Sequence, residues 1–282
     1  MAGRFQGSSV FITGASSGIG EALARAFALE GARLALAARR LERLESVRQE
    51  LMPAAAEVLA VPCDVTSRPS LDAAVAQTAE AFGGIDVAVA NAGFGVTGFF
   101  QDLSTADFRR QFETNVFGPM RLVRAVVPGM RERGHGVVVN VTSVEGRVAA
   151  PLSGAYCATK HALEALSESL AFEVGHFGVR VVIVEPGYIA PGMRNQVRHG
   201  EEGTPYAELR AQWSGADETL VGPAGRPAPE LVGRAIADAI ADPDTPLRVP
   251  VGADAEMVLS ARAALDDAAV SACICEPPAS TC

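Results

Sequence analysis

The chain has 282 residues, of which 49% are hydrophobic and 20% charged, and its formal net charge at pH 7 is −9. This length allows a large buried core, the composition excludes a disordered or fibrous protein, and the acidic balance argues against nucleic acid as a partner. No apolar run approaches the ~20 residues of a membrane helix, and residues 1–9 hold no apolar signal segment, so we expect a cytoplasmic protein without a membrane partner.

Short apolar runs alternate with segments of helical periodicity from residue 10 to about residue 250. The runs predict β-strands over residues 10–13, 34–38, 58–62, 87–91, 137–142, 179–185 and 247–250. One-sided apolar patterns predict helices over residues 19–30, 41–51, 71–82, 104–132, 153–177 and 229–241, with a short one over 206–213. Ser104 and Asp107 have the spacing of a capping box and are expected to open the fourth of these helices.

Strands that are apolar without alternation, each followed by a helix, indicate a parallel sheet covered on both faces. Right-handed crossovers then predict an α/β fold with a doubly wound, mostly parallel, Rossmann-like sheet, whose ligand site lies at the carboxyl ends of the strands. We expect a single domain over residues 1–255. Residues 186–228, rich in Pro, Gly and charge, should form a substrate loop or lid. A C-terminal helix and flexible tail are expected over residues 256–282.

The cysteines do not suggest a metal site. Cys63 and Cys157 lie in apolar segments and are expected to be small buried hydrophobes. Cys273, Cys275 and Cys282 lie in the tail, where no histidine or second cysteine pair completes a zinc spacing. We therefore expect no metal.

Residues 13–20 read Thr-Gly-Ala-Ser-Ser-Gly-Ile-Gly and fall at the first strand-to-helix turn. Glycines at this place let a pyrophosphate approach the backbone amides of a helix N-terminus, whose partial positive charge favours an anion. The spacing is not that of the common dinucleotide fingerprint, so a purely structural tight turn is the alternative. Its position between a strand and a helix favours the dinucleotide site.

Cofactor choice depends on the residues that follow the second predicted strand. Ala38 stands where an acidic residue would hold the ribose hydroxyl of NAD, and Arg39 and Arg40 follow it. A guanidinium can bind the 2′-phosphate of NADP bidentately, and no carboxylate is present to repel that phosphate. The alternative is that both arginines only solvate a helix start, where cations are mildly unfavourable. We expect NADP(H) to be preferred over NAD(H), with Arg39 weighted above Arg40.

A serine, a tyrosine and a lysine form the candidate catalytic group. Ser143 follows a predicted strand, and Tyr156 and Lys160 are four residues apart on one helical face. A nearby ammonium favours the phenolate, so we expect Lys160 to lower the tyrosine pKa from ~10 toward neutral pH. Such a tyrosine can exchange a proton with a carbonyl or alcohol oxygen, while Ser143 fixes the geometry of that oxygen.

Over about residues 7–255, these motifs together resemble the short-chain dehydrogenase/reductase family. Ser143, Tyr156 and Lys160 match its catalytic set, and Asn115 matches a fourth position thought to hold a water that links the lysine to solvent. The resemblance implies cofactor contacts at Gly14, Ser16, Ser17, Gly18, Ile19, Gly20, Arg39, Arg40, Asp64, Val65, Asn91, Ala92, Gly93, Tyr156, Lys160, Pro186, Gly187 and Ile189. Pro191 departs from the family pattern, because a threonine there usually meets the nicotinamide carboxamide and proline has no donor.

The expected activity is hydride transfer between NADP(H) and a ketone or secondary alcohol, with Tyr156 as general acid and base. Proximity to the motifs predicts a fairly apolar substrate pocket lined by Phe94, Val96, Glu145, Val148, Tyr188, Met193 and Trp213. Glu145 either orients a polar substituent of the substrate or faces water.

Four alternatives stand beside this activity: an NAD-preferring dehydrogenase of the same family, an epimerase or dehydratase on a related scaffold, a non-enzymatic NADP sensor, and a scaffold protein. The chain after residue 228 is short for the substrate domain of an epimerase. The sensor and the scaffold protein leave the catalytic group unexplained. The resemblance further implies a homodimer or homotetramer built on the two long helices.

Overall fold

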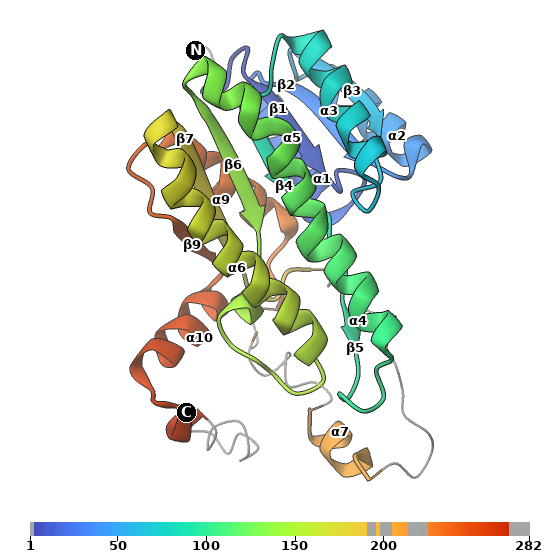
Figure 1. The fold of residues 1–282 in the computed structure, drawn as a ribbon, viewed down its shortest axis with the longest axis vertical. Helices are drawn as coiled ribbons and strands as arrows, with labels where there is room; N and C mark the ends of the chain where they lie inside the picture. Colours follow the sequence, from blue (N-terminus) through green and yellow to red (C-terminus); the bar gives the residue numbers. More distant parts are fainter. Residues whose placement is uncertain (1–2, 191–195, 198–204, 214–220, 222–224, 271–282) are drawn as a thin grey trace.

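Seven strands form the central sheet of the computed structural model, which describes residues 3–190, 196–197, 205–213, 221 and 225–270. They are β1 (Ser9–Thr13), β2 (Arg33–Ala38), β3 (Glu57–Pro62), β4 (Val87–Ala90), β6 (Gly136–Val141), β7 (Val179–Pro186) and β9 (Arg248–Val251). All pair in parallel, in the order β3-β2-β1-β4-β6-β7-β9 (Figure 1). The chain reverses its direction of travel across the sheet after β3, so the predicted doubly wound α/β sheet is confirmed.

Helices cover both faces of the sheet. The longer helices are α1 (Gly18–Leu29), α2 (Leu41–Leu51), α3 (Arg68–Phe82), α4 (Thr105–Phe112), α5 (Gly118–Arg133), α6 (Gly154–Val174), α9 (Pro229–Ala241) and α10 (Ala253–Ala264). One apolar core joins α1, α2 and α9 to the sheet, and a second joins α3, α5 and the end of α6 to its other face. Within β1, Val10 and Ile12 belong to the first core and Phe11 to the second, which explains the unbroken apolar run.

The helix predicted over residues 104–132 is divided by a π-helical turn. Ser104 and Asp107 form the expected capping box at the start of α4. A π-helix over Glu113–Phe117 then joins α4 to α5. Such a turn inserts one extra residue into the helix and often marks a functional position. Here it carries Asn115.

Two short strands and one short helix lie beyond the carboxyl ends of the strands of the main sheet (Figure 1). The strands β5 (Val96–Thr97) and β8 (Gln196–Val197) pair in parallel, and sequence analysis predicted neither. The helix α7 (Ala207–Trp213) was predicted. No helix in the described part of the chain is long and apolar enough to cross a membrane.

Candidate active site

The glycine-rich turn is packed tightly between β1 and the end of β4. Gly14 has a φ of +70°, and a Cβ there would lie 2.9 Å from Asn91 Nδ2. At Gly20, a Cβ would lie 2.4 Å from the carbonyl oxygen of Gly14. Asn91 Nδ2 in turn donates to the carbonyl oxygen of Thr13 at 3.0 Å. The two glycines are therefore needed for close approach, and Asn91 ties the turn to the neighbouring strand.

The outer side of this turn can receive an anion. Gly18 opens α1 with a φ of +58°, and a Cβ there would meet no atom within 4 Å in the described part of the chain. Arg40 Nη2 donates to the hydroxyls of Ser16 and Ser17 at 3.0 and 3.1 Å. Open space, a helix N-terminus and a guanidinium therefore meet at one place, which fits the pyrophosphate and phosphate groups of a dinucleotide.

Of the two predicted arginines, Arg40 contacts the glycine-rich turn, although sequence analysis gave Arg39 the greater weight. Arg39 lies near Asp64 instead. Burial acts to raise the pKa of Asp64, but hydrogen bonds from Thr66 and the Arg39 guanidinium hold this pKa below its ordinary value. Asp64 Oδ1 accepts from the backbone N and the hydroxyl of Thr66 at 2.9 and 2.8 Å, which fixes the loop after β3. Its neighbour Val65 is fixed by Arg121 Nη1, which donates to the Val65 carbonyl oxygen at 3.1 Å.

Ser143, Tyr156 and Lys160 meet beyond the carboxyl end of β6. The Ser143 side chain lies close enough to Tyr156 to act on the pKa of the tyrosine. Lys160 Nζ lies 5.5 Å from the centroid of the Tyr156 ring and donates to the carbonyl oxygen of Val141 at 2.9 Å. Tyr156 and Lys160 are buried, with 8% and 5% of their surface exposed. The structure thus brings together three residues that are up to 17 positions apart in the sequence.

Burial sets the protonation of this group. It raises the pKa of Tyr156 above its ordinary value, and the Glu145 carboxylate adds to the rise, while the Ser143 side chain opposes it. Burial also lowers the pKa of Lys160 to about 8, against the opposing effects of Glu164 and Glu145. The direction is therefore opposite to the expected lowering of the tyrosine pKa, because burial and the Glu145 carboxylate outweigh the interaction that favours the phenolate.

Asn115 links helix α6, which carries Tyr156 and Lys160, to the loop after β4. Its Oδ1 accepts from the backbone N of Phe94 at 3.1 Å, and its Nδ2 donates to the Phe94 carbonyl oxygen at 2.8 Å and to Thr159 Oγ1 at 3.1 Å. Thr159 precedes Lys160 on α6. The side chain is 1% exposed, so it holds these elements together from the interior. The preceding residues Ala92 and Gly93 are thereby positioned beside the glycine-rich turn, where Ala92 N donates to Thr13 Oγ1 at 3.2 Å.

Glu145 lies in the 3-10 turn η2 (Val144–Gly146), directly after Ser143. Its backbone N donates to Ser143 Oγ at 3.1 Å, and the Ser153 and Cys157 side chains lie beside its carboxylate. Burial raises the pKa of Glu145, although these two side chains and the charge of Lys160 oppose the rise. The half-buried Glu145 therefore places a carboxyl group beside the tyrosine.

The other predicted pocket residues are placed differently. Val96 is fully buried against Leu103 and Ala155, within the wall of the site. The loops after β4 and η2 carry Phe94 and Val148, both partly buried, and Trp213 ends α7. Met193, like Pro191, lies outside the described residues.

Asp254 is a site-supporting residue that sequence analysis missed. It lies in the first turn of α10, and its Oδ2 accepts from the backbone N of Tyr188 at 2.6 Å. A Cβ at Gly187 would lie 2.1 Å from the same carboxylate oxygen, so glycine is required there. Asp254 therefore fixes the Pro186–Ile189 segment, in which Ile189 packs into the core. No local motif marks an aspartate so far along the chain.

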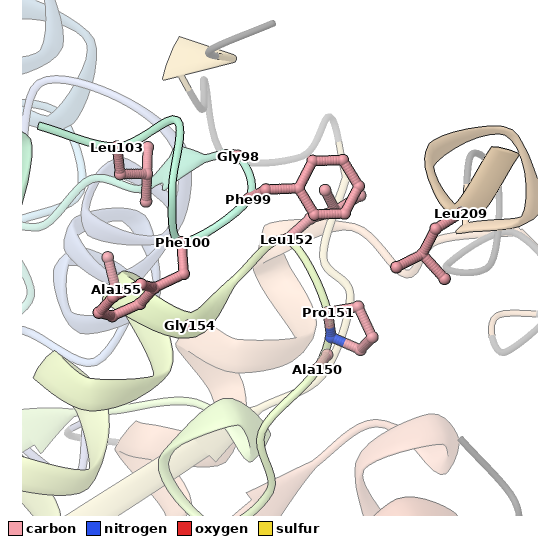
Figure 2. A pocket seen from close by; sticks show the side chains of 10 residues that line it. All are labelled: Gly98, Phe99, Phe100, Leu103, Ala150, Pro151, Leu152, Gly154, Ala155 and Leu209. Atoms are coloured by element: carbon pink, nitrogen blue, oxygen red, sulfur yellow. The ribbon is translucent and has the colours of Figure 1, made fainter. Parts of the chain in front are cut away.

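An apolar cavity of about 240 Å³ borders the catalytic helix (Figure 2). Its walls come from the loop after β5, the loop before α6, the start of α6 and helix α7, and are formed by Gly98, Phe99, Phe100, Leu103, Ala150, Pro151, Leu152, Gly154, Ala155 and Leu209. Leu152 has a φ of +66°, a strained conformation for leucine, and its carbonyl oxygen accepts from Gly98 N at 2.8 Å. Leu209 points toward this loop across the opening (Figure 2). Ala155 precedes Tyr156 on α6, but the cavity is lined by neither Ser143, Tyr156 nor Lys160.

Comparison with known proteins agrees with this geometry. The protein-family model described as short chain dehydrogenase matches residues 8–202. The dehydrogenase/reductase SDR family protein 7-like of Anopheles gambiae is 39% identical over 217 residues, which make up 74% of this chain and 67% of that protein. Two mammalian relatives are matched over 57% of their length, so this chain is shorter than they are.

Two solved structures with bound nicotinamide cofactors are similar to the chain. A short-chain dehydrogenase/reductase from Burkholderia phymatum in complex with NAD has a TM-score of 0.80 and 28% identity, over 99% of both chains. An alcohol dehydrogenase from the archaeon Thermococcus sibiricus, complexed with 5-hydroxy-NADP, has a TM-score of 0.72 and 29% identity, over 86% of this chain and 95% of that one. The two neighbours hold different cofactors.

Proposed function

The chain belongs to the short-chain dehydrogenase/reductase family, an oxidoreductase family that acts on CH–OH and carbonyl groups with NAD(P), and on this premise we propose that it is an NADP(H)-dependent carbonyl reductase or alcohol dehydrogenase. The observation that carries the proposal is the buried group of Tyr156, Ser143 and Lys160. An NADP sensor or a scaffold protein would have no use for a tyrosine held between a serine hydroxyl and an ammonium.

In this proposal, the nicotinamide supplies or accepts the hydride when it is bound. The Tyr156 hydroxyl gives its proton to the carbonyl oxygen during reduction and takes a proton from the alcohol during oxidation. Ser143 orients the same oxygen by a hydrogen bond. The Lys160 ammonium lies close enough to stabilise the phenolate that forms.

The cofactor would lie along the carboxyl ends of β1, β2 and β4. The turn at Gly14, Gly18 and Gly20 would hold the pyrophosphate, and Arg39 and Arg40 would hold the 2′-phosphate of NADP. The absence of an acidic residue at Ala38 supports NADP over NAD. The NAD complex of the Burkholderia phymatum relative keeps an NAD-preferring dehydrogenase as the second candidate.

The substrate would be a fairly apolar ketone or secondary alcohol. The cavity beside Ala155 has apolar walls, and a strained Leu152 lies in one of them, which is consistent with a binding role. Glu145 would add one polar contact near the reacting carbon, to a hydrogen-bond donor of the substrate.

We further propose a homodimer or homotetramer in the cytoplasm. On α6, Phe172 is 77% and Leu166 40% exposed, and Phe117, just before α5, is 42% exposed. Exposed apolar side chains on long helices are typical of an interface between subunits.

The test is a panel of ketones and secondary alcohols, assayed by the absorbance of the reduced nicotinamide with NADP(H) and NAD(H) in parallel. We expect turnover with at least one apolar ketone and a higher kcat/KM with NADPH than with NADH. Turnover that prefers NADH would select the second candidate. Cofactor binding without any turnover would instead favour a sensor.

A further inference from the structure

A third polar residue, Glu164, continues the row that Tyr156 and Lys160 form on α6. Tyr156, Lys160 and Glu164 follow one another at intervals of four residues, so they lie on one face of the helix. Glu164 is 4% exposed. A carboxylate buried this deeply needs charged or hydrogen-bonding partners, and the proposed mechanism gives it no part.

The position of the Glu164 carboxylate is fixed from three sides. Thr142 Oγ1 donates to Glu164 Oε1 at 2.6 Å, and Arg248 Nε of β9 lies 2.9 Å from Glu164 Oε2. Gly146 packs against the same turn of α6, because a Cβ there would lie 2.9 Å from Glu164 Cγ and 3.2 Å from the carbonyl oxygen of Lys160. Glu164 is thus held rigidly one helical turn beyond Lys160.

The charged groups around this carboxylate are both basic and acidic. Arg248 also contacts Glu168 at 3.3 Å and lies 4.0 Å from the buried Glu185. Arg147 Nη1 lies 3.2 Å from Glu185. On the opposite side of Lys160, Tyr156 and Glu145 complete the set. Glu164, Glu168 and Glu185 therefore share two guanidinium groups, and of these three carboxylates Glu164 is the one that acts on Lys160.

We propose that Glu164 is a positioning residue that, held by Thr142 and Arg248, keeps Lys160 protonated in the working enzyme. A carboxylate that is fixed near a buried amine favours the charged form of that amine, and Arg248 limits the effect by neutralising part of the carboxylate charge. The consequence for catalysis rests on the proposed function, whereas the effect on Lys160 itself does not.

This role matters because burial does not favour the protonated form of Lys160. Burial alone lowers the pKa of Lys160, and it stands at about 8 with the carboxylates Glu164 and Glu145 opposing this effect. Without Glu164, a larger fraction of Lys160 would be neutral near pH 7. A neutral amine cannot stabilise the Tyr156 phenolate by its charge.

The sequence offers a direct measurement. The 24 lysine and arginine residues are 23 arginines and one lysine, Lys160. Biosynthetic labelling with lysine that carries carbon-13 at Cε therefore gives one lysine side-chain signal, whose chemical shift against pH reports the pKa of Lys160. No activity is needed for this titration.

In Glu164→Gln, which keeps the shape of the side chain, we expect the pKa of Lys160 to fall by about half to one unit. Glu164→Asp retains the charge and should stay closer to the parent protein. Glu168→Gln is the matched control, because it removes a half-exposed carboxylate that shares Arg248, and it should leave the titration unchanged. In Arg248→Gln, the pKa of Lys160 should rise, since the carboxylate charge is no longer offset.

The pH profile of alcohol oxidation provides the second readout. In Glu164→Gln, the pH of half-maximal oxidation should move upward by a similar amount, while Glu168→Gln should not move it. The proposal is overturned if folded Glu164→Gln titrates Lys160 as the parent does, whatever the fate of Arg248→Gln. If Lys160 shifts as expected but Tyr156→Phe keeps full activity, the proposed function fails and the role of Glu164 toward Lys160 stands.

Discussion

The candidate site is made of backbone in the glycine-rich turn between β1 and α1, and of polar side chains after β6 and on α6. Gly14 and Gly20 are needed because the chain approaches itself closely, and Gly18 leaves space for a ligand. On α6, in contrast, Tyr156 and Lys160 are buried side chains whose charge depends on their neighbours.

The difference separates two kinds of sensitivity. Backbone amides and glycines do not titrate, so the cofactor end should bind over a wide pH range and fail only when its shape or its arginines change. The catalytic end depends on the pKa values of coupled groups, so small changes of charge should move its pH profile. Binding and proton transfer can therefore be disrupted independently.

The largest expected effect is a loss of proton transfer that leaves cofactor binding intact. Tyr156→Phe removes the transferable proton and keeps the ring, so kcat should fall by at least ~100-fold, as for the loss of a general acid. Affinity for NADPH, measured by calorimetry, should stay unchanged. Activity within about threefold of the parent would contradict the role of Tyr156.

The next largest effect is a change of cofactor preference that leaves proton transfer intact. Ala38→Asp combined with Arg39→Leu removes an attraction for the 2′-phosphate and adds a repulsion, so the preference should reverse from NADPH to NADH. Charge-assisted hydrogen bonds of about 1.5–3 kcal/mol correspond to a shift of about ten- to a hundredfold.

The matched variant Ala38→Asp with Arg40→Leu measures how much Arg40 contributes to the preference for NADP. Because Arg40 is already engaged with Ser16 and Ser17, we expect it to change the preference less. Kinetics with both cofactors at constant pH decide the matter, and a parent protein that already favours NADH refutes the assignment of Ala38 and Arg39.

Lys160→Met tests whether Lys160 serves both proton transfer and cofactor binding. Loss of the ammonium should move the pH of half-maximal alcohol oxidation upward by about one unit, because the phenolate loses its nearest cation. The family resemblance also implies that Lys160 holds the nicotinamide ribose, so cofactor affinity should weaken as well. An unchanged pH profile together with normal affinity would rule out both roles.

The smallest expected effect has the opposite sign. The Glu145 carboxylate raises the pKa of Tyr156, so Glu145→Gln should move the pH of half-maximal oxidation downward, by about half a unit. The same profile measured in Glu164→Gln should move upward, which makes each variant a control for the other. Shifts in one direction for both would mean that general loss of negative charge, rather than position, governs the tyrosine.

The sheet was predictable because its strands are apolar on both faces and each is followed by a regular helix. Val10, Phe11 and Ile12, for example, pack into two different cores, and this leaves an unmistakable run in the sequence. The shared helical face of Tyr156 and Lys160 was predictable for a similar reason, since a spacing of four residues on one helix fixes relative position without knowledge of the fold.

Features that depend on contacts between distant segments could not be predicted. The apolar cavity requires α7 to face the loop before α6, and Leu152 adopts a backbone conformation that its residue type does not suggest. The pKa of Tyr156 is raised, and not lowered as expected, because the ring is buried and Glu145 lies near it. Neither feature follows from the spacing of residues in the sequence. The π-turn at Asn115 leaves no periodic signal of its own.

The Asp254 contact joins the carboxyl end of the sheet to helix α10. A Cβ at Gly187 or Gly252 would lie within 2.5 Å of the Asp254 carboxylate, so this side chain fills the space between the ends of β7 and β9. Helix α10 extends from Ala253 to Ala264 and crosses the predicted boundary at residue 255. A chain cut at that boundary would keep the aspartate but lose the helix that holds it. The segment after Pro186 would then lack its anchor, so α10 is as much part of the active-site architecture as the loops that face the substrate.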